Sequence, residues 1–113
     1  LDEIMTKLRT LVQETGVALF VVSHLKRPDA KGHEEGAATS LAQLRGSGSI
    51  AQLSDMVIGL ERNGQHEDVK ERNTTYVRVL KNRFAGITGL ACRLLYSRDT
   101  GRMTELPPKE DSL

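Results

Sequence analysis

The stretch Val17-Ala18-Leu19-Phe20-Val21-Val22 decides the fold that we expect for this chain. It is a continuous apolar run, which is typical of a strand buried on both faces of a parallel sheet. An amphipathic helical pattern precedes it, with apolar residues at helical spacing from Leu1 to Val12, and Gly16 is a natural helix end. The run stops at Ser23-His24. A helix followed by a buried strand predicts an α/β fold.

Four further strands are expected after this run. Apolar and β-branched residues predict them at residues 56–60, 75–81, 90–96 and near Met103. The last three indicate an antiparallel meander joined to the edge of a parallel sheet. The sequence therefore predicts a mixed, mainly parallel sheet that ends in antiparallel strands.

Polar and glycine-rich segments separate the expected strands. Residues 25–40 and 62–73 predict long loops, and residues 41–45 and 49–53 predict short helices, the second capped by Ser49. The tail, residues 107–113, is expected to be disordered, which leaves one domain over residues 1–106. The helical pattern is already present at Leu1, without an initiator methionine or a cap. We therefore expect a piece of a larger protein; a methionine removed by processing is the alternative.

The composition of the chain limits the classes of function that it can have. The chain has 113 residues, with 16 Lys and Arg against 15 Asp and Glu, a formal net charge of +1. This balance argues against a chain that binds polyanions over its whole surface, but it allows a local basic patch. No apolar run approaches the roughly 18 residues of a membrane span, so no membrane partner is expected. The single cysteine, Cys92, fits a reducing compartment and excludes an internal disulfide.

Several residues are candidates for binding an anion, each with a plainer alternative. His24 follows the predicted parallel strand, where ligands bind in open α/β sheets, although a surface histidine is the simpler interpretation. Lys26, Arg27 and Lys31 place three positive charges in one loop, which can track a nucleic-acid backbone or simply be solvated. No metal site is expected, because His33-Glu34 lacks a second histidine four residues after His33.

The end of the third predicted strand offers a second candidate. Lys81 and Arg83 are two residues apart, so both side chains can reach one phosphate, or they can protect a sheet edge. Arg62 and Tyr96 can each stack on a flat ring, although either can be structural. The glycine-rich residues 44–49 lack the Gly-Lys-Ser/Thr of a phosphate-binding loop, and the remaining chain does not supply it.

Four short motifs occur in a fixed order along the chain. They are His24-Leu25-Lys26, then Leu44-Arg45-Gly46-Ser47-Gly48 through Gln52-Leu53-Ser54-Asp55, then Leu60-Glu61-Arg62-Asn63, then Lys81-Asn82-Arg83-Phe84 with Gly86 and Gly89. In this order they resemble the hexameric replicative helicases of the DnaB type, closest to the helicase half of bacteriophage primase–helicases. The resemblance extends over roughly residues 1–104. It implies the C-terminal half of a RecA-like P-loop NTPase core, with the Walker A loop and Walker B acid outside this chain.

The resemblance also implies roles for the DNA-facing residues. His24 matches the histidine near the γ-phosphate that links the nucleotide state to the DNA loop. Residues 26–35 match the loop that lines the central channel, with Lys26 and Lys31 as candidate DNA contacts. Arg45 matches the motif between the channel and the nucleotide, and it is a third candidate DNA contact.

Further roles are implied around the nucleotide. Gln52 belongs to the same motif as Arg45, and the resemblance implies a catalytic role for it. Arg62 and Tyr96 match the residues that sandwich the nucleotide base. Lys81 and Arg83 match the pair that reaches into the nucleotide site of the neighbouring subunit.

The function implied by the resemblance is NTP-driven translocation on single-stranded DNA and duplex unwinding by a ring, expected to be a hexamer, in the cytoplasm of a bacterial or phage-infected cell. ATP or another NTP with Mg²⁺ would be bound mainly by the missing half, so this chain alone should not hydrolyse NTP. A primase is a possible attached or associated partner. Two alternatives stay open: a RecA-like recombinase or ATPase regulator, and a stand-alone nucleic-acid-binding domain.

Overall fold

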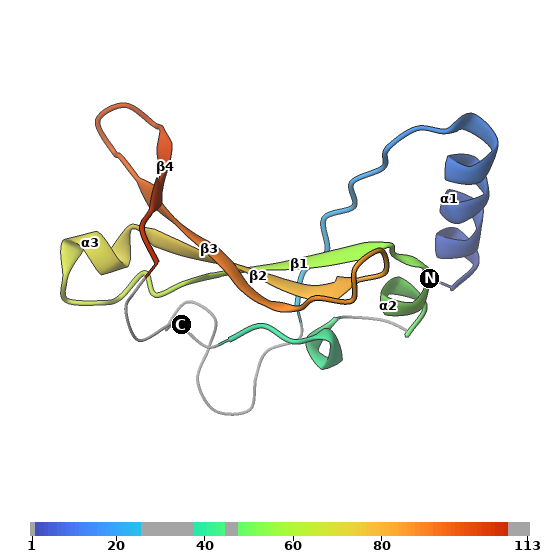
Figure 1. The fold of residues 1–113 in the computed structure, drawn as a ribbon, viewed down its shortest axis with the longest axis horizontal. Coiled ribbons are helices and arrows are strands. Elements are labelled where there is room, and N and C mark those ends of the chain that lie inside the picture. The colour runs from blue at the N-terminus through green and yellow to red at the C-terminus, as the bar shows by residue number, and fades with distance from the viewer. Residues whose placement is uncertain (1, 26–37, 45–47, 109–113) are drawn as a thin grey trace.

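The computed structural model describes residues 2–25, 38–44 and 48–108, and its main feature is one antiparallel sheet (Figure 1). The sheet has four strands in the order β1-β2-β3-β4. Three α-helices and one 3₁₀ helix complete the described chain. The elements are α1 (Asp2–Thr15), η1 (Leu41–Gln43), α2 (Ser49–Leu53), β1 (Met56–Arg62), α3 (Val69–Arg72), β2 (Thr74–Asn82), β3 (Gly89–Tyr96) and β4 (Met103–Leu106).

Helix α1 confirms the amphipathic pattern. It ends at Thr15, where the N–H of Gly16 donates to the carbonyl of Val12 at 2.9 Å. Gly16 has φ +72°, a conformation that glycine adopts without strain, so the helix stops where the sequence predicts. Met5, 8% exposed, is the one buried hydrophobic residue of the described chain.

The four strands after residue 55 confirm the strand predictions, and the meander is antiparallel as expected. β1 pairs with β2, β2 with β3, and β3 with β4, each antiparallel. Register shifts occur in β1 between Val57 and Ile58 and in β2 between Val77 and Arg78. All strand pairs among the described residues are antiparallel, so this sheet contains no parallel part within the described ranges.

The predicted buried strand at residues 17–22 is wrong for this structure. The segment is irregular, with Phe20 92% exposed and Val22 93% exposed. A strand needs a neighbour that satisfies its N–H and C=O groups, and the described residues place none beside it. Figure 1 shows this segment rising from the sheet to α1. Beyond it, Leu25 forms an isolated antiparallel bridge with Leu44.

The local predictions between the strands need smaller corrections. The expected loop 62–73 contains α3, whose N-cap Asp68 accepts the N–H of Lys70 at 3.3 Å. The helix expected at 49–53 is present, but its N-cap is Gly48 rather than Ser49. The turn expected at residues 41–45 is η1, a 3₁₀ helix that ends at Gln43. Arg45 and residues 109–113 of the predicted tail lie outside the described residues.

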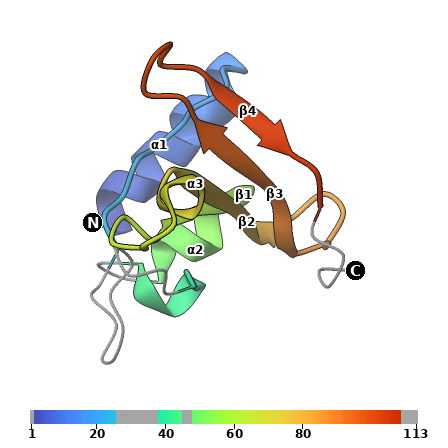
Figure 2. The same ribbon diagram turned by 90° about the vertical axis from the view of Figure 1, so that its left-hand side faces the viewer.

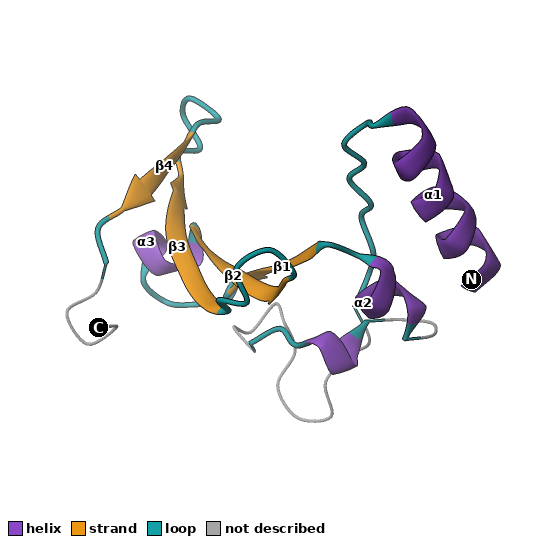
Figure 3. Cartoon of the chain, turned by 45° about the vertical axis from the view of Figure 1, so that its right-hand side comes forward, coloured by secondary structure: helices purple, strands orange, loops and turns teal. Residues whose placement is uncertain are grey.

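The two faces of the sheet have different surroundings. Segment Ala38–Leu44 lies below the sheet in Figure 1, and Figure 2 shows the same arrangement from the side. On the other side the ribbon is open, with α1 and β4 standing apart at its two ends (Figure 3). Ile58 and Leu60 on β1 are 54% and 64% exposed. The Cα radius of gyration is 16.0 Å, whereas about 13 Å is typical of a compact domain of this length.

None of the described helices is long and apolar enough to span a membrane.

Candidate functional site

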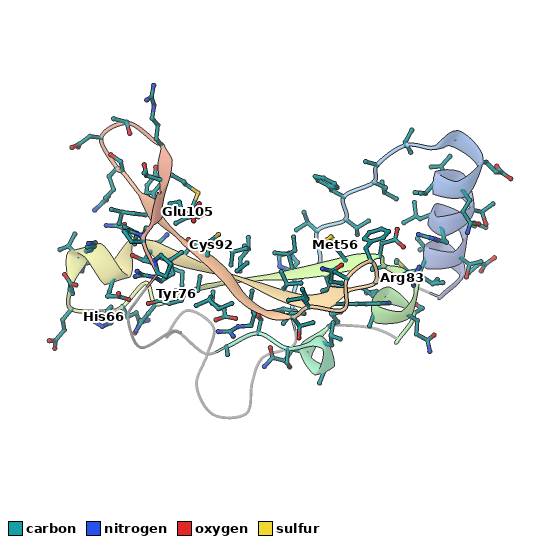
Figure 4. The ribbon with its side chains drawn as sticks, in the orientation of Figure 1. Met56, His66, Tyr76, Arg83, Cys92 and Glu105 are labelled. Carbon is teal, nitrogen blue, oxygen red and sulfur yellow. The ribbon has the colours of Figure 1, made fainter. Side chains whose placement is uncertain are left out.

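Arg83 lies at the end of the sheet beside α1 and α2 (Figure 4). Its Nη1 donates to Oδ1 of Asp55 at 2.8 Å, and its Nη2 donates to the carbonyl of Gln52 at 2.6 Å. The other carboxylate oxygen of Asp55, Oδ2, accepts from Nη1 of Arg9 on α1 at 2.8 Å. We call Arg9, Asp55 and Arg83 the Asp55 cluster. It joins three segments that are far apart in the sequence.

Lys81 belongs to the same neighbourhood. Its Nζ donates to the carbonyls of Ala51 and Gln52, the second at 3.1 Å. Lys81 and Arg83 therefore converge on the Gln52 carbonyl, at the end of α2 where helix carbonyls lack intrahelical partners. The structure brings together three of the four residues predicted as catalytic: Gln52, Lys81 and Arg83.

The charges of this region leave a positive excess. The charge of Arg9 offsets that of Asp55, so the excess of two positive charges comes from Lys81 and Arg83. The hydrogen bond from Arg9, with the charges of Arg9 and Arg83, outweighs desolvation and lowers the pKa of Asp55 below its usual range. Asp55 is therefore ionised at neutral pH, and the surplus positive charge favours an anion.

A second ionic cluster lies near the other end of β1. Oε2 of Glu61 accepts from the Thr39 N–H at 2.8 Å, the Thr39 hydroxyl at 2.7 Å and Arg78 Nε at 2.8 Å, and Oε1 accepts from Arg78 Nη2 at 3.2 Å. We call Thr39, Glu61 and Arg78 the Glu61 cluster. Its Thr39 sits against Gly59 of β1, where a Cβ would collide with the Thr39 hydroxyl. The cluster fixes segment Ala38–Leu44 to one face of the sheet.

Burial and hydrogen bonding oppose each other in the Glu61 cluster. Burial favours the neutral acid and would raise the pKa of Glu61, but the hydrogen bonds from Arg78 and Thr39 outweigh it, so that the pKa is lowered below its ordinary value of 4.5. The hydrogen bond to Glu61 in turn raises the pKa of Arg78. The pair is therefore fully ionised at neutral pH.

Arg62 and Tyr96 lie at the same end of the sheet. Strand register pairs Arg62 with Thr75 and Thr75 with Leu94, and Tyr96 follows Leu94 by two residues, so both side chains face the same side. The Cα atoms of Arg62 and Tyr96 are two strands apart across the sheet and two residues apart along the strand direction, which corresponds to about 12 Å. Nε of Arg62 donates to the Arg72 carbonyl at 2.7 Å, and the N–H of Tyr96 donates to the carbonyl of Asn73 at 2.9 Å. Adjacent carbonyls thus hold both residues.

The remaining predicted site residues are less informative. His24 is exposed in the irregular segment before Leu25, and no hydrogen bond or ion pair among the described residues links it to the Asp55 cluster. Lys26 and Lys31, the predicted DNA contacts, lie outside the described residues, as does Arg45. The part of the chain that the structure describes contains no group of three or more His, Cys, Asp or Glu that could hold a metal ion.

Sequence reasoning did not single out Arg9, Asp55 or Glu61. Arg9 follows the buried Met5 by one helical turn, so a charge on the apolar face of α1 was the available signal. Glu61 lies on the same face of β1 as Val57 and Gly59, where an acidic side chain indicates a buried partner. The partners themselves are 46 residues away for Arg9 and 17 for Glu61, and no local pattern identifies them.

Comparison with known proteins places the chain in a family. Residues 1–105 match the DnaB-like helicase C-terminal domain, so the chain belongs to that family and the resemblance inferred from its motifs is confirmed. A curated relative, the "DNA helicase/primase" of Enterobacteria phage T3, is 50% identical to it over 102 residues. That alignment covers 89% of this chain and 18% of the relative, so the chain spans less than a fifth of that protein's length.

Proposed function

We propose that this chain is the C-terminal part of the RecA-like core of a replicative DNA helicase. The full-length protein would couple NTP hydrolysis to translocation on single-stranded DNA and to duplex unwinding. Family membership and a relative described as a helicase/primase support this function. The observation that carries the proposal is the convergence of Lys81 and Arg83, with excess positive charge, at one end of the sheet.

The open side of the sheet supports an origin in a larger domain. Residues 17–22 are apolar and exposed, and so are Ile58 and Leu60 on β1. Exposed apolar surfaces of this kind mark contacts with another protein surface. In the full-length protein, residues 17–22 would join a mainly parallel sheet contributed by the rest of the core. Residues 1–106 would then be the end of that domain, and residues 107–113 a tail.

Arg62 and Tyr96 are suited to hold a nucleotide base. A guanidinium plane and a phenol ring on one face can stack on opposite sides of a flat base. Both residues are exposed, and adjacent carbonyls hold the Arg62 side chain and the Tyr96 backbone. Mg²⁺, which neutralises phosphate charge when bound, would be held by the Walker residues outside this chain.

Arg83 is suited to act on the nucleotide of a neighbouring subunit. Its side chain is 40% exposed although it holds two carbonyl or carboxylate partners. Phosphoryl transfer depends on positioning and on neutralising charge, and an arginine supplied in trans contributes about 10³–10⁵ in rate in other NTPases. Hydrolysis would then require a closed ring, for which a hexamer is the expected form. Lys81 would support the same anion, and Gln52 would lie beside it.

The DNA-binding role falls on residues whose structure is not described. Lys26, Lys31 and Arg45 would contact the backbone of single-stranded DNA, and His24 would relay the nucleotide state to them. The name of the T3 relative favours a primase, attached or associated, as a partner. A protein of this kind would act in the cytoplasm of a phage-infected bacterial cell.

The proposal is tested with the full-length protein and with residues 1–113 alone. Hydrolysis of ATP and of the other NTPs is measured with Mg²⁺, with and without single-stranded DNA, together with the unwinding of a forked duplex. The full-length protein is expected to show DNA-stimulated hydrolysis and unwinding, and residues 1–113 neither. Turnover by residues 1–113 at the full-length rate would contradict the proposal, as would hydrolysis without unwinding by the full-length ring.

A further inference from the structure

The backbone of residue 83 is fixed by the start of β1. The N–H of Arg83 donates to the carbonyl of Asp55 at 2.9 Å. The same residue, Asp55, then accepts from the Arg83 side chain through Oδ1 at 2.8 Å. Asp55 therefore determines both where the Arg83 side chain starts and where its charged end lies.

The guanidinium of Arg83 is held at two points. Asp55 Oδ1 binds Nη1, and the Gln52 carbonyl binds Nη2 at 2.6 Å. Two attachments fix the plane of a guanidinium as well as its position. These bonds use two of its five N–H donors, so donors remain for an outside anion. The 40% exposure of the side chain leaves it accessible to one.

The two oxygens of Asp55 are divided between two arginines. Oδ2 binds Arg9 of α1, and Oδ1 binds Arg83. The bond to Arg9 ties α1 to the sheet and does not involve Arg83. Removing Arg9 and removing the carboxylate of Asp55 are therefore separable changes. The first breaks the tie to α1, and the second also releases Arg83.

We propose that Asp55 is a positioning residue for hydrolysis, which orients the guanidinium of Arg83 toward the phosphates bound by the neighbouring subunit. The inference rests on the proposed role of Arg83 in trans. In this role Asp55 acts through Arg83, to which it is hydrogen-bonded. Misplacing a catalytic group by about 1 Å can lower a rate by about 10²-fold, so the loss of this contact has a measurable cost.

The test uses the full-length helicase with saturating single-stranded DNA, and kcat and KM for the NTP are measured separately. Asp55→Asn keeps the shape of the side chain and one acceptor oxygen, but it removes the charge. We expect kcat to fall by about tenfold to 10²-fold. KM should stay within about twofold, because Asp55 is not expected to change how tightly the NTP binds in the ground state. The matched control is Arg9→Gln, which should leave kcat within about twofold because Asp55 still holds Arg83.

Three outcomes would overturn the inference: an unchanged kcat in Asp55→Asn, a rise in kcat, or an equal loss of kcat in Arg9→Gln. The first two show that Asp55 is not needed or restrains Arg83, and the third shows that the tie to α1 is what matters. Arg83→Ala is assayed in parallel. If it hydrolyses NTP normally, the proposed role of Arg83 fails; if it is inactive while Asp55→Asn is normal, only the role of Asp55 fails.

Ring assembly is checked by size-exclusion chromatography with light scattering. Should Asp55→Asn subunits not assemble alone, they are assayed in rings with an excess of wild-type subunits. If turnover per ring falls as the fraction of mutant subunits rises, the inference is supported. If turnover per ring stays at the wild-type value, the inference is overturned.

Discussion

The Asp55 cluster and the Glu61 cluster are built from the same chemistry at the two ends of β1. In each, a carboxylate binds an arginine that follows it in the sequence and one further residue from another segment, Arg9 or Thr39. They differ in exposure, because the side chain of Glu61 is 6% exposed and that of Asp55 is 34% exposed.

This difference separates the structural role of Glu61 from the role that we propose for Arg83. Glu61 fills its Oε2 with three donors and packs Thr39 against Gly59, so nothing from outside can reach it. Arg83 keeps free donors and an accessible surface although Asp55 holds it. A buried ion pair chiefly fixes the fold and is costly to break, whereas an exposed one adds little stability and can serve a ligand.

The largest effect is expected at the exposed cluster. Arg83→Ala in the full-length protein should lower DNA-stimulated NTP turnover by about 10³–10⁵, the range found for arginines supplied in trans. Nucleotide binding and ring assembly should survive better than turnover, because the subunit's own phosphate loop is intact. Steady-state hydrolysis and equilibrium nucleotide binding check this. A parallel loss of binding and assembly would show that Arg83 is structural, like Arg78.

Breaking the buried cluster should cost stability instead. Glu61→Ala leaves Arg78 without its partner and is expected to destabilise the region by about 3 kcal/mol, whereas Glu61→Gln, which keeps the shape, should cost about 1–2 kcal/mol. Hydrogen exchange of the segment 38–44 in the full-length ring reports it through the Thr39 amide, which donates to Glu61.

The control for these variants is Glu3→Gln on α1. It removes an exposed 3.8 Å pair with Lys7 and should change stability by less than about 0.5 kcal/mol. If segment 38–44 is protected from hydrogen exchange as well in Glu61→Ala as in Glu3→Gln, the Glu61 cluster does not fix that segment.

Acid should release the buried cluster at low pH only. Because the pKa of Glu61 is below its ordinary value of 4.5 in the folded chain, its stabilisation is complete above that value and is lost as the pH falls through the folded pKa. Arg78, its charged partner among the described residues, stays protonated throughout. Protection of the Thr39 amide, corrected for intrinsic exchange, should be constant from pH 7 to about 5.5 and fall below about 4.5. In Glu61→Gln the same profile should be flat.

The smallest effect concerns the predicted DNA loop. Lys26→Ala with Lys31→Ala should weaken single-stranded DNA binding at every sequence and reduce the salt slope by up to about 1.4, about 0.7 for each charge. Titrations of labelled oligonucleotides at several salt concentrations measure the slope. An unchanged slope would mean that these lysines are solvated and do not contact DNA. It would not bear on the roles of the Asp55 and Glu61 clusters.

The sequence predicted the parts of this fold that depend on local pattern. Met56–Arg62, Thr74–Asn82 and Gly89–Tyr96 were recognisable as strands because β-branched and apolar residues favour extended chain and their partners follow directly along the chain. Residues 17–22 have the same apolar character, yet they are irregular here. A strand is completed by hydrogen bonds to a neighbour, and no composition of its own residues supplies that neighbour.

The candidate site shows the same division. Lys81 and Arg83 were predicted to point to one place from their spacing of two residues, and they converge on Gln52. Asp55 was visible only as part of a family motif, because its partner on α1 is 46 residues away. Nonlocal ion pairs depend on how the elements pack, which local spacing does not encode.

The central claim is that Arg83 acts on the nucleotide of the neighbouring subunit, and mixed rings test it most directly. Full-length Arg83→Ala subunits are mixed with subunits whose phosphate-loop lysine is replaced, each inactive alone. If Arg83 acts in trans, some interfaces combine an intact phosphate loop with an intact Arg83, and part of the DNA-stimulated hydrolysis should return. The contradicting result is mixed rings that form but recover no activity, while rings with a single Arg83→Ala subunit stay active, because Arg83 would then act within its own subunit.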